Sequence, residues 1–101
     1  MMDMEKARRE QIRWLILVAV NAGRPLAVAE PLILGAIQAV PVQCTALELR
    51  REMDYLDDRK LVHLARPEGA PWAAELTRHG VDFVEYTIDA EPGIARPKKY
   101  W

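Results

Sequence analysis

The chain has 101 residues, a length that supports one compact domain with a single hydrophobic core. Half of the residues are hydrophobic and 29% are charged, and the net charge of -1 excludes a polycation that would coat nucleic acid indiscriminately. The longest apolar run, Trp14–Val20, is too short to span a bilayer. Acidic residues interrupt the basic N-terminal segment, and no small-residue cleavage site follows the apolar run, so we expect no signal peptide. The single cysteine, Cys44, excludes an internal disulfide and fits a reducing cytoplasm.

The first predicted helix covers residues 12–22 and ends at Gly23, because glycine readily closes a helix. Residues 1–11 are charged and either fray or begin this helix. The apolar residues of the helix occupy more than one face, and such a helix is normally buried on two sides. A small core covers one side, so the other needs the chain's own tail or a second subunit. We therefore predict a homodimer. Its interface is expected to comprise Trp14, Leu17, Val18, Val20, Tyr100 and Trp101.

Residues 24–44 are predicted to turn, add a short strand and form a second helix. Leu26–Val28 suit an extended segment that pairs with the later hairpin. Pro31 suits the first turn of a helix over 31–40, and Pro41 ends it. The expected buried side of this helix comprises Leu32, Ile33, Ala36, Ile37 and Val40.

Residues 45–76 are predicted to form a helix that leads directly into a β-hairpin. Thr45 can cap a helix over 45–60, and Glu48 completes a capping box. The hairpin over 61–76 is indicated by two short apolar segments around the turn residues RPEGAP. Thr77 can cap a last helix over 77–86, and residues 91–101 form an irregular tail after a domain over 1–90. The expected buried face of the 45–60 helix comprises Ala46, Leu49, Met53 and Leu56.

Two helices joined by a short turn, 31–40 and 45–60, define a helix-turn-helix, and the hairpin after them would be its wing. The expected fold is therefore mainly α with a small β-hairpin, a winged helix-turn-helix.

The segments LRREMDYLDDRKLVHL and AELTRHGVDFVE resemble winged-helix regulators. In those proteins the helix ends in a step of leucine, a basic residue or glycine, leucine and valine, and a Leu-Thr-x-x-Gly step opens the last helix. The closing PGIARP, Pro92–Pro97, is similar to the end of a small family of phage and Mu-like prophage proteins, loosely labelled ArsR-like. The resemblance covers nearly the whole chain and implies a phage or prophage protein in the cytoplasm of a bacterial host. The residues that match the two steps are Leu56, Lys60, Leu61, Val62, Leu76, Thr77 and Gly80.

Two functions are compatible with this scaffold, because winged helices serve both DNA binding and protein docking. In the first, a transcriptional regulator, the 45–60 helix enters the major groove of double-stranded DNA. The residues expected to contact DNA are Gln43, Thr45, Glu48, Arg50, Arg51 and, in the hairpin, Arg66.

The alternative is a module that docks a phage or host protein without binding DNA. Residues 45–60 contain four basic and five acidic side chains, and affinity for phosphate is largely electrostatic. Leu47 and Tyr55 also place apolar area on the outward face of the helix. These features favour protein docking, whereas the resemblance favours DNA binding.

No pattern in the chain indicates catalysis or a cofactor. The sequence lacks serine altogether and has no glycine-rich phosphate loop. Cys44, His63 and His79 do not stand at a metal-ligand spacing, so no metal site is expected. A cysteine just before a helix can have a lowered thiol pKa, although a plain turn cysteine is the simpler interpretation of Cys44.

Overall fold

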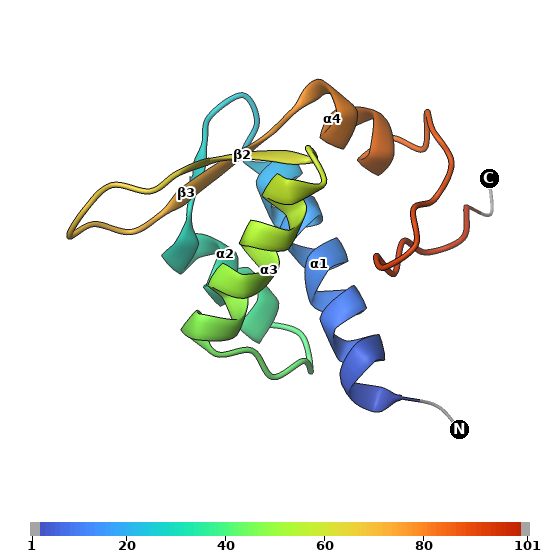
Figure 1. Cartoon of the computed structure of the whole chain (residues 1–101), viewed down its shortest axis with the longest axis horizontal. Coiled ribbons are helices and arrows are strands. Elements are labelled where there is room, and N and C mark those ends of the chain that lie inside the picture. The colour runs from blue at the N-terminus through green and yellow to red at the C-terminus, as the bar shows by residue number, and fades with distance from the viewer. Residues whose placement is uncertain (1–2, 100–101) are drawn as a thin grey trace.

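The computed structural model describes residues 3–99, which form four helices and a small three-stranded antiparallel sheet. The predicted helices and the hairpin are confirmed, with boundaries shifted by a few residues, except that the first helix starts eight residues earlier than the position predicted, residue 12. No helix of this part of the chain is long and apolar enough to cross a membrane. The elements are, in chain order, α1 (Met4–Ala22), β1 (Val28–Ala29), α2 (Glu30–Gln38), α3 (Ala46–Asp58), β2 (Val62–Ala65), β3 (Ala73–Leu76) and α4 (Arg78–Val84) (Figure 1).

The charged N-terminal segment belongs to α1. The Asp3 side chain caps the helix by accepting a hydrogen bond from the Lys6 amide at 3.1 Å. Further along α1, Arg13 Nε donates to Glu52 Oε1 of α3 at 2.7 Å, and both side chains are largely buried. Arg13 therefore ties α1 to α3.

The surface of α2 is more apolar than expected. The helix begins one residue before Pro31 and ends at Gln38. Of its five expected core residues, only Ile33 and Ile37 are buried, because α2 contacts the rest of the molecule along one narrow stripe. The prediction was wrong for the other three, Leu32, Ala36 and Val40, which are exposed.

The sheet joins the hairpin to the start of α2. Its strand order is β1-β3-β2, and both pairings are antiparallel. Val28 lies opposite Ala74, so the short strand expected near 26–28 is present, shifted to Val28–Ala29. Beyond β1, the Glu30 amide donates to the Trp72 carbonyl at 2.8 Å. The loop of the hairpin extends away from the helices (Figure 1).

The step from β3 into α4 explains the Leu-Thr-x-x-Gly pattern. Thr77 Oγ1 accepts a hydrogen bond from the Gly80 amide at 3.0 Å and donates to the Lys60 carbonyl at 2.6 Å. The Thr77 amide donates to the Leu61 carbonyl at 3.1 Å. A Cβ at position 80 would lie 2.0 Å from the Leu61 oxygen, so this approach of α4 to the exit of α3 requires glycine.

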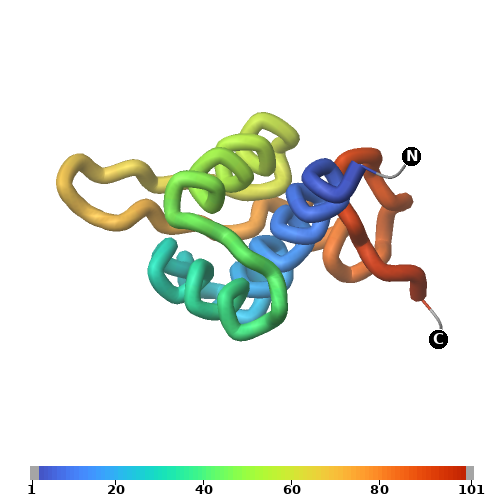
Figure 2. The backbone as a smooth tube through the Cα atoms, turned by 90° about the horizontal axis from the view of Figure 1, so that it is seen from below, coloured from blue at the N-terminus to red at the C-terminus, as the bar shows by residue number. Residues whose placement is uncertain are grey.

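The core continues past the domain boundary expected at residue 90. Ile94 is buried, and the Ala95 amide donates to the Glu10 carbonyl at 3.1 Å. Arg13 Nη1 donates to the Gly93 carbonyl at 2.8 Å, which fixes the tail beside α1 (Figure 2). Arg96 donates to the Phe83 carbonyl at 3.0 Å and so links the tail to α4 as well. The tail therefore packs on α1 as expected, while Tyr100 and Trp101 lie outside the described residues.

The prediction of a dimer surface on α1 was wrong for residues that are buried within the chain itself. Leu17 and Val20 are fully buried within the chain, so they offer no surface to a second subunit. Trp14 is half-buried and packs edge-on against Phe83 of α4, with ring centroids 6.1 Å apart. Val18 alone among the four α1 residues is exposed. Three of these four residues are therefore wholly or partly buried within the same chain, and Trp14 packs on α4.

Candidate functional site

The helix α3 is stabilised by a capping box at its N-terminus and by the packing of its buried face. Thr45 and Glu48 form the predicted capping box, in which the Glu48 amide donates to Thr45 Oγ1 at 3.1 Å. The expected buried residues Leu49, Met53 and Leu56 are in the core, together with Glu52, whereas Ala46 is exposed. Three of the six residues expected to bind DNA, Glu48, Arg50 and Arg51, lie in α3 and outside this buried set.

Arg50 is engaged by a carboxylate of α2. Its Nε and Nη2 donate to the two oxygens of Glu30 at 2.9 and 2.5 Å, and its guanidinium lies 4.5 Å from the centre of the Trp72 ring. Glu30 Oε1 also accepts from the Trp72 amide at 2.7 Å. The hydrogen bonds from Arg50 hold the pKa of the Glu30 carboxyl below its ordinary value. Arg50 therefore joins α2, α3 and the hairpin.

Arg66 of the hairpin is also engaged, in this case by α3. Its Nη2 donates to Asp54 Oδ1 at 2.5 Å and to Asp57 Oδ2 at 3.3 Å. The guanidinium also lies 5.0 Å from the centre of the Trp72 ring. The one arginine expected at the wing tip thus turns back toward α3, and its charge is balanced by two aspartates.

The start of α3 is tied to α1 by Arg8. Arg8 donates to the Gln43 carbonyl at 2.7 Å and forms an ion pair with Glu48. The Gln43 and Thr45 side chains are near the surface, as expected for DNA contacts. The Glu48 carboxylate, however, places negative charge at the end of the helix that would approach phosphate, and Arg8 holds the pKa of this carboxyl below its usual range.

Arg51 differs from the other two arginines. It is exposed, and it forms no hydrogen bond or ion pair with another residue of the described part of the chain. It stands one helical turn after Leu47, whose side chain is 62% exposed. The outward face of α3 therefore offers one apolar side chain and one cation next to each other.

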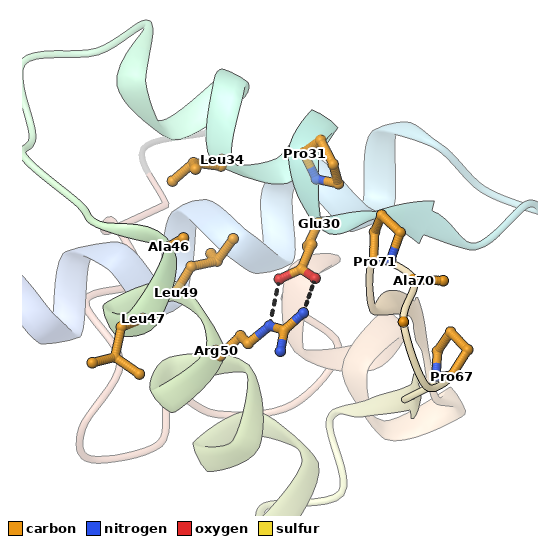
Figure 3. Close-up of a pocket in the computed structure, with 11 residues that line it drawn as sticks. Glu30, Pro31, Leu34, Ala46, Leu47, Leu49, Arg50, Pro67, Ala70 and Pro71 are labelled. Carbon is orange, nitrogen blue, oxygen red and sulfur yellow. Dashed lines mark hydrogen bonds and ion pairs between the residues drawn. The ribbon is translucent and has the colours of Figure 1, made fainter.

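An open groove of about 760 Å³ lies between α2, the first half of α3 and the hairpin loop. Its charged residues are Glu30 and Arg50, which neutralise each other inside it (Figure 3). Its volume falls within the range of roughly 300–1,000 Å³ that is typical of ligand pockets. The remaining lining is Pro31 and Leu34 of α2, Ala46, Leu47 and Leu49 of α3, and Pro67, Gly69, Ala70 and Pro71 of the hairpin loop.

Cys44 and the histidines form no reactive cluster. Burial raises the pKa of the Cys44 thiol, so the suggestion of a lowered pKa was wrong. The turn before α3 buries this side chain in the core. His79 lies beside Glu91, with Nε2 2.8 Å from Oε1. Across residues 3–99 no group of three metal-ligating side chains gathers that could hold a metal ion.

Sequence reasoning missed the partners that decide the chemistry of this face. Glu30 was passed over as a residue before a helix-starting proline, and Trp72 as a strand residue. Both contact Arg50, which is separated from Glu30 by 20 positions in the chain. A glutamate at the start of an apolar helix was the signal available in the sequence, because a carboxylate that such a helix buries requires a cation or several donors.

Comparison with known proteins indicates a fold and no family. No protein-family profile matches the chain, and no curated protein matches it. Among solved structures, it is similar to human N-acetylserotonin methyltransferase in complex with SAM, with a TM-score of 0.54 and 15% sequence identity. The match covers 79% of this chain and 21% of that protein, so the shared region is about a fifth of the methyltransferase's length. At this identity the similarity concerns the fold alone.

Proposed function

We propose that the chain is a winged helix-turn-helix module whose α3 and hairpin dock a protein rather than read DNA. The fold part of this proposal is supported by the order of the elements: α2 and α3 follow each other across a turn, and the hairpin comes directly after α3. The short strand β1 adds a third strand to the hairpin. In this interpretation α3 is the recognition helix and the loop between β2 and β3 is the wing. The resemblance to phage and prophage proteins supports a partner of phage or host origin.

The docking proposal rests on one observation: the face formed by α3 and the hairpin neutralises two of its three arginines, Arg50 and Arg66. Arg50 is paired with Glu30, and Arg66 with Asp54 and Asp57. Affinity for DNA depends mainly on cations that can neutralise phosphates. Arg50 and Arg66 would have to exchange charge-assisted hydrogen bonds within the protein for bonds to phosphate. Next to these pairs lies an apolar groove, which suits a protein surface better than a phosphate backbone.

The test is a fluorescence anisotropy titration with a labelled duplex from the chain's own promoter region. At about 50 mM salt, where electrostatic binding is strong, we expect no saturable binding at micromolar protein. Arg51→Ala, which removes the unpaired cation of α3, should leave the titration unchanged. Saturable binding that falls steeply with added salt would contradict the proposal.

DNA binding is the second candidate, and the free side chain of Arg51 is the observation that favours it. An exposed, unpaired arginine on α3 can make a bidentate contact to guanine in the major groove. In that case Arg51→Ala should weaken binding to one preferred sequence by about tenfold or more and reduce discrimination at a single base position. Equal loss on unrelated sequences would indicate a phosphate contact instead.

A further inference from the structure

The groove between α2, α3 and the hairpin has a lining that restricts what can fill it. Two of the hairpin residues in it, Pro67 and Pro71, lack an amide hydrogen, and so does Pro31 on the opposite wall. These three positions cannot donate to the backbone of an incoming extended strand. The groove therefore offers little main-chain pairing to a peptide that adds itself as a strand.

The carboxylate of the groove is already occupied. Glu30 accepts from Arg50 through both oxygens and from the Trp72 amide. An extended peptide would bury backbone amides and carbonyls here without partners, and each unpaired group is costly. A helix avoids this cost because its backbone groups are paired internally. The lining therefore favours an occupant that arrives as a helix and inserts side chains only.

On the α3 side of the groove the unbalanced charge is positive, whereas Glu68, exposed in the hairpin loop between the lining residues Pro67 and Gly69, adds a negative charge on the hairpin side. The Glu30–Arg50 pair is neutral as a whole, and Arg50 is partly exposed with Nη1 still able to donate. Arg51 adds a free cation one turn from Leu47, which lines the groove. A carboxylate on the occupant, next to the side chains that enter the groove, would complement this charge.

We infer that the groove binds an amphipathic helix of a partner protein, with apolar residues at i, i+4 and i+7 and an acidic residue beside them. This inference rests on the proposed docking function and names the chemistry of the docked segment. The apolar residues fill the space between Leu34, Leu47 and Pro71, and the acid meets Arg51 and the free nitrogen of Arg50.

The probe is a displayed library of helical peptides of about 18 residues, long enough to hold a helix. Each peptide has three apolar anchors at the stated spacing, and the flanking position varies among Glu, Gln and Lys. Selected peptides are then measured by anisotropy against the full chain and three variants. Leu47→Asp places a charge in the groove. Leu26→Asp is the matched control, because Leu26 is 74% exposed but lies outside the groove. Arg51→Ala tests whether the positive charge of Arg51 attracts the acidic residue of the peptide.

We expect selection of Glu at the flanking position. Leu47→Asp should weaken binding at least about tenfold, since it desolvates a charge in an apolar contact, whereas Leu26→Asp should change it less than about twofold. Arg51→Ala should weaken the Glu peptide about threefold and leave the Gln peptide unchanged.

Three results would overturn the inference while leaving protein docking in place. These are enrichment of Lys at the flanking position, absence of any enriched helical peptide, and equal effects of Leu47→Asp and Leu26→Asp. A change in sedimentation of the isolated chain caused by Leu47→Asp would assign the groove to a second copy and also overturn it. If no peptide binds and the chain binds DNA in a salt-sensitive way, the proposed docking function is contradicted as well.

Discussion

Replacing Gly80 with alanine tests the packing that sets α4 against the exit of α3. The added Cβ would lie 2.0 Å from the Leu61 oxygen and 3.3 Å from Leu76 Cδ2, so α4 must move by more than an ångström. That movement breaks the 3.1 Å hydrogen bond from the Thr77 amide to Leu61. Overpacking costs about 1–3 kcal/mol and the lost hydrogen bond about 1 kcal/mol, while alanine's higher helix propensity returns up to about 1 kcal/mol. We expect a net loss of about 2–3 kcal/mol in the free energy of unfolding.

The measurement is urea and thermal denaturation followed by circular dichroism. For a chain of this size, the predicted loss lowers Tm by roughly 10–20 °C. Gly35→Ala is the matched control, because Gly35 also lies in a helix but a Cβ there meets nothing within 4 Å. That variant should gain up to about 1 kcal/mol. If Gly80→Ala proves as stable as the wild type, α4 does not pack against Leu61 as described.

Three further predictions concern the tail, the pH dependence and the cysteine. Ile94→Ala should lower the free energy of unfolding by about 2–4 kcal/mol in urea denaturation, because Ile94 is buried; an unchanged midpoint would place the tail outside the core. Arg50 lowers the pKa of Glu30, so the stability that this carboxylate contributes is complete above its unfolded-state pKa of about 4.3 and is lost as pH falls through the lower folded value. The stability difference between the wild type and Glu30→Gln should therefore narrow in acid, and a constant difference down to pH 2 would contradict the pairing. Cys44 should react with iodoacetamide near pH 8 far more slowly in the folded chain than in urea, because burial raises its pKa; equal rates would show an accessible thiol.

The parts of the fold that sequence predicted correctly depend on neighbours close in the chain. Thr45 and Glu48 are three positions apart, as are Thr77 and Gly80, so both caps are local patterns. The hairpin likewise follows from turn residues between two short apolar segments.

The failures share one cause, which is that contacts between distant segments are invisible in a local pattern. Leu17 and Val20 were assigned to a dimer because the sequence does not show that the core of the same chain buries them. Arg50 and Arg66 were taken as available for DNA because the sequence does not show the carboxylates that pair with them, Glu30 among them. In each case the sequence showed correctly whether the side chain was apolar or charged, but it did not show which side chain lay next to it.

Carboxylates of the chain neutralise Arg50 and Arg66, two of the three arginines of α3 and the hairpin that would otherwise be available to DNA. The most direct measurement is the slope of the logarithm of DNA affinity against the logarithm of salt concentration, which is about -0.9 for each phosphate neutralised. We compare the wild type with a triple variant, Glu30→Gln with Asp54→Asn and Asp57→Asn, that frees Arg50 and Arg66. We expect no saturable binding by the wild type at about 50 mM salt, and for the variant a slope of roughly -1.8, which corresponds to two phosphates neutralised. A wild-type slope as steep as about -3, unchanged in the variant, would show that these arginines are not neutralised and that the face binds DNA.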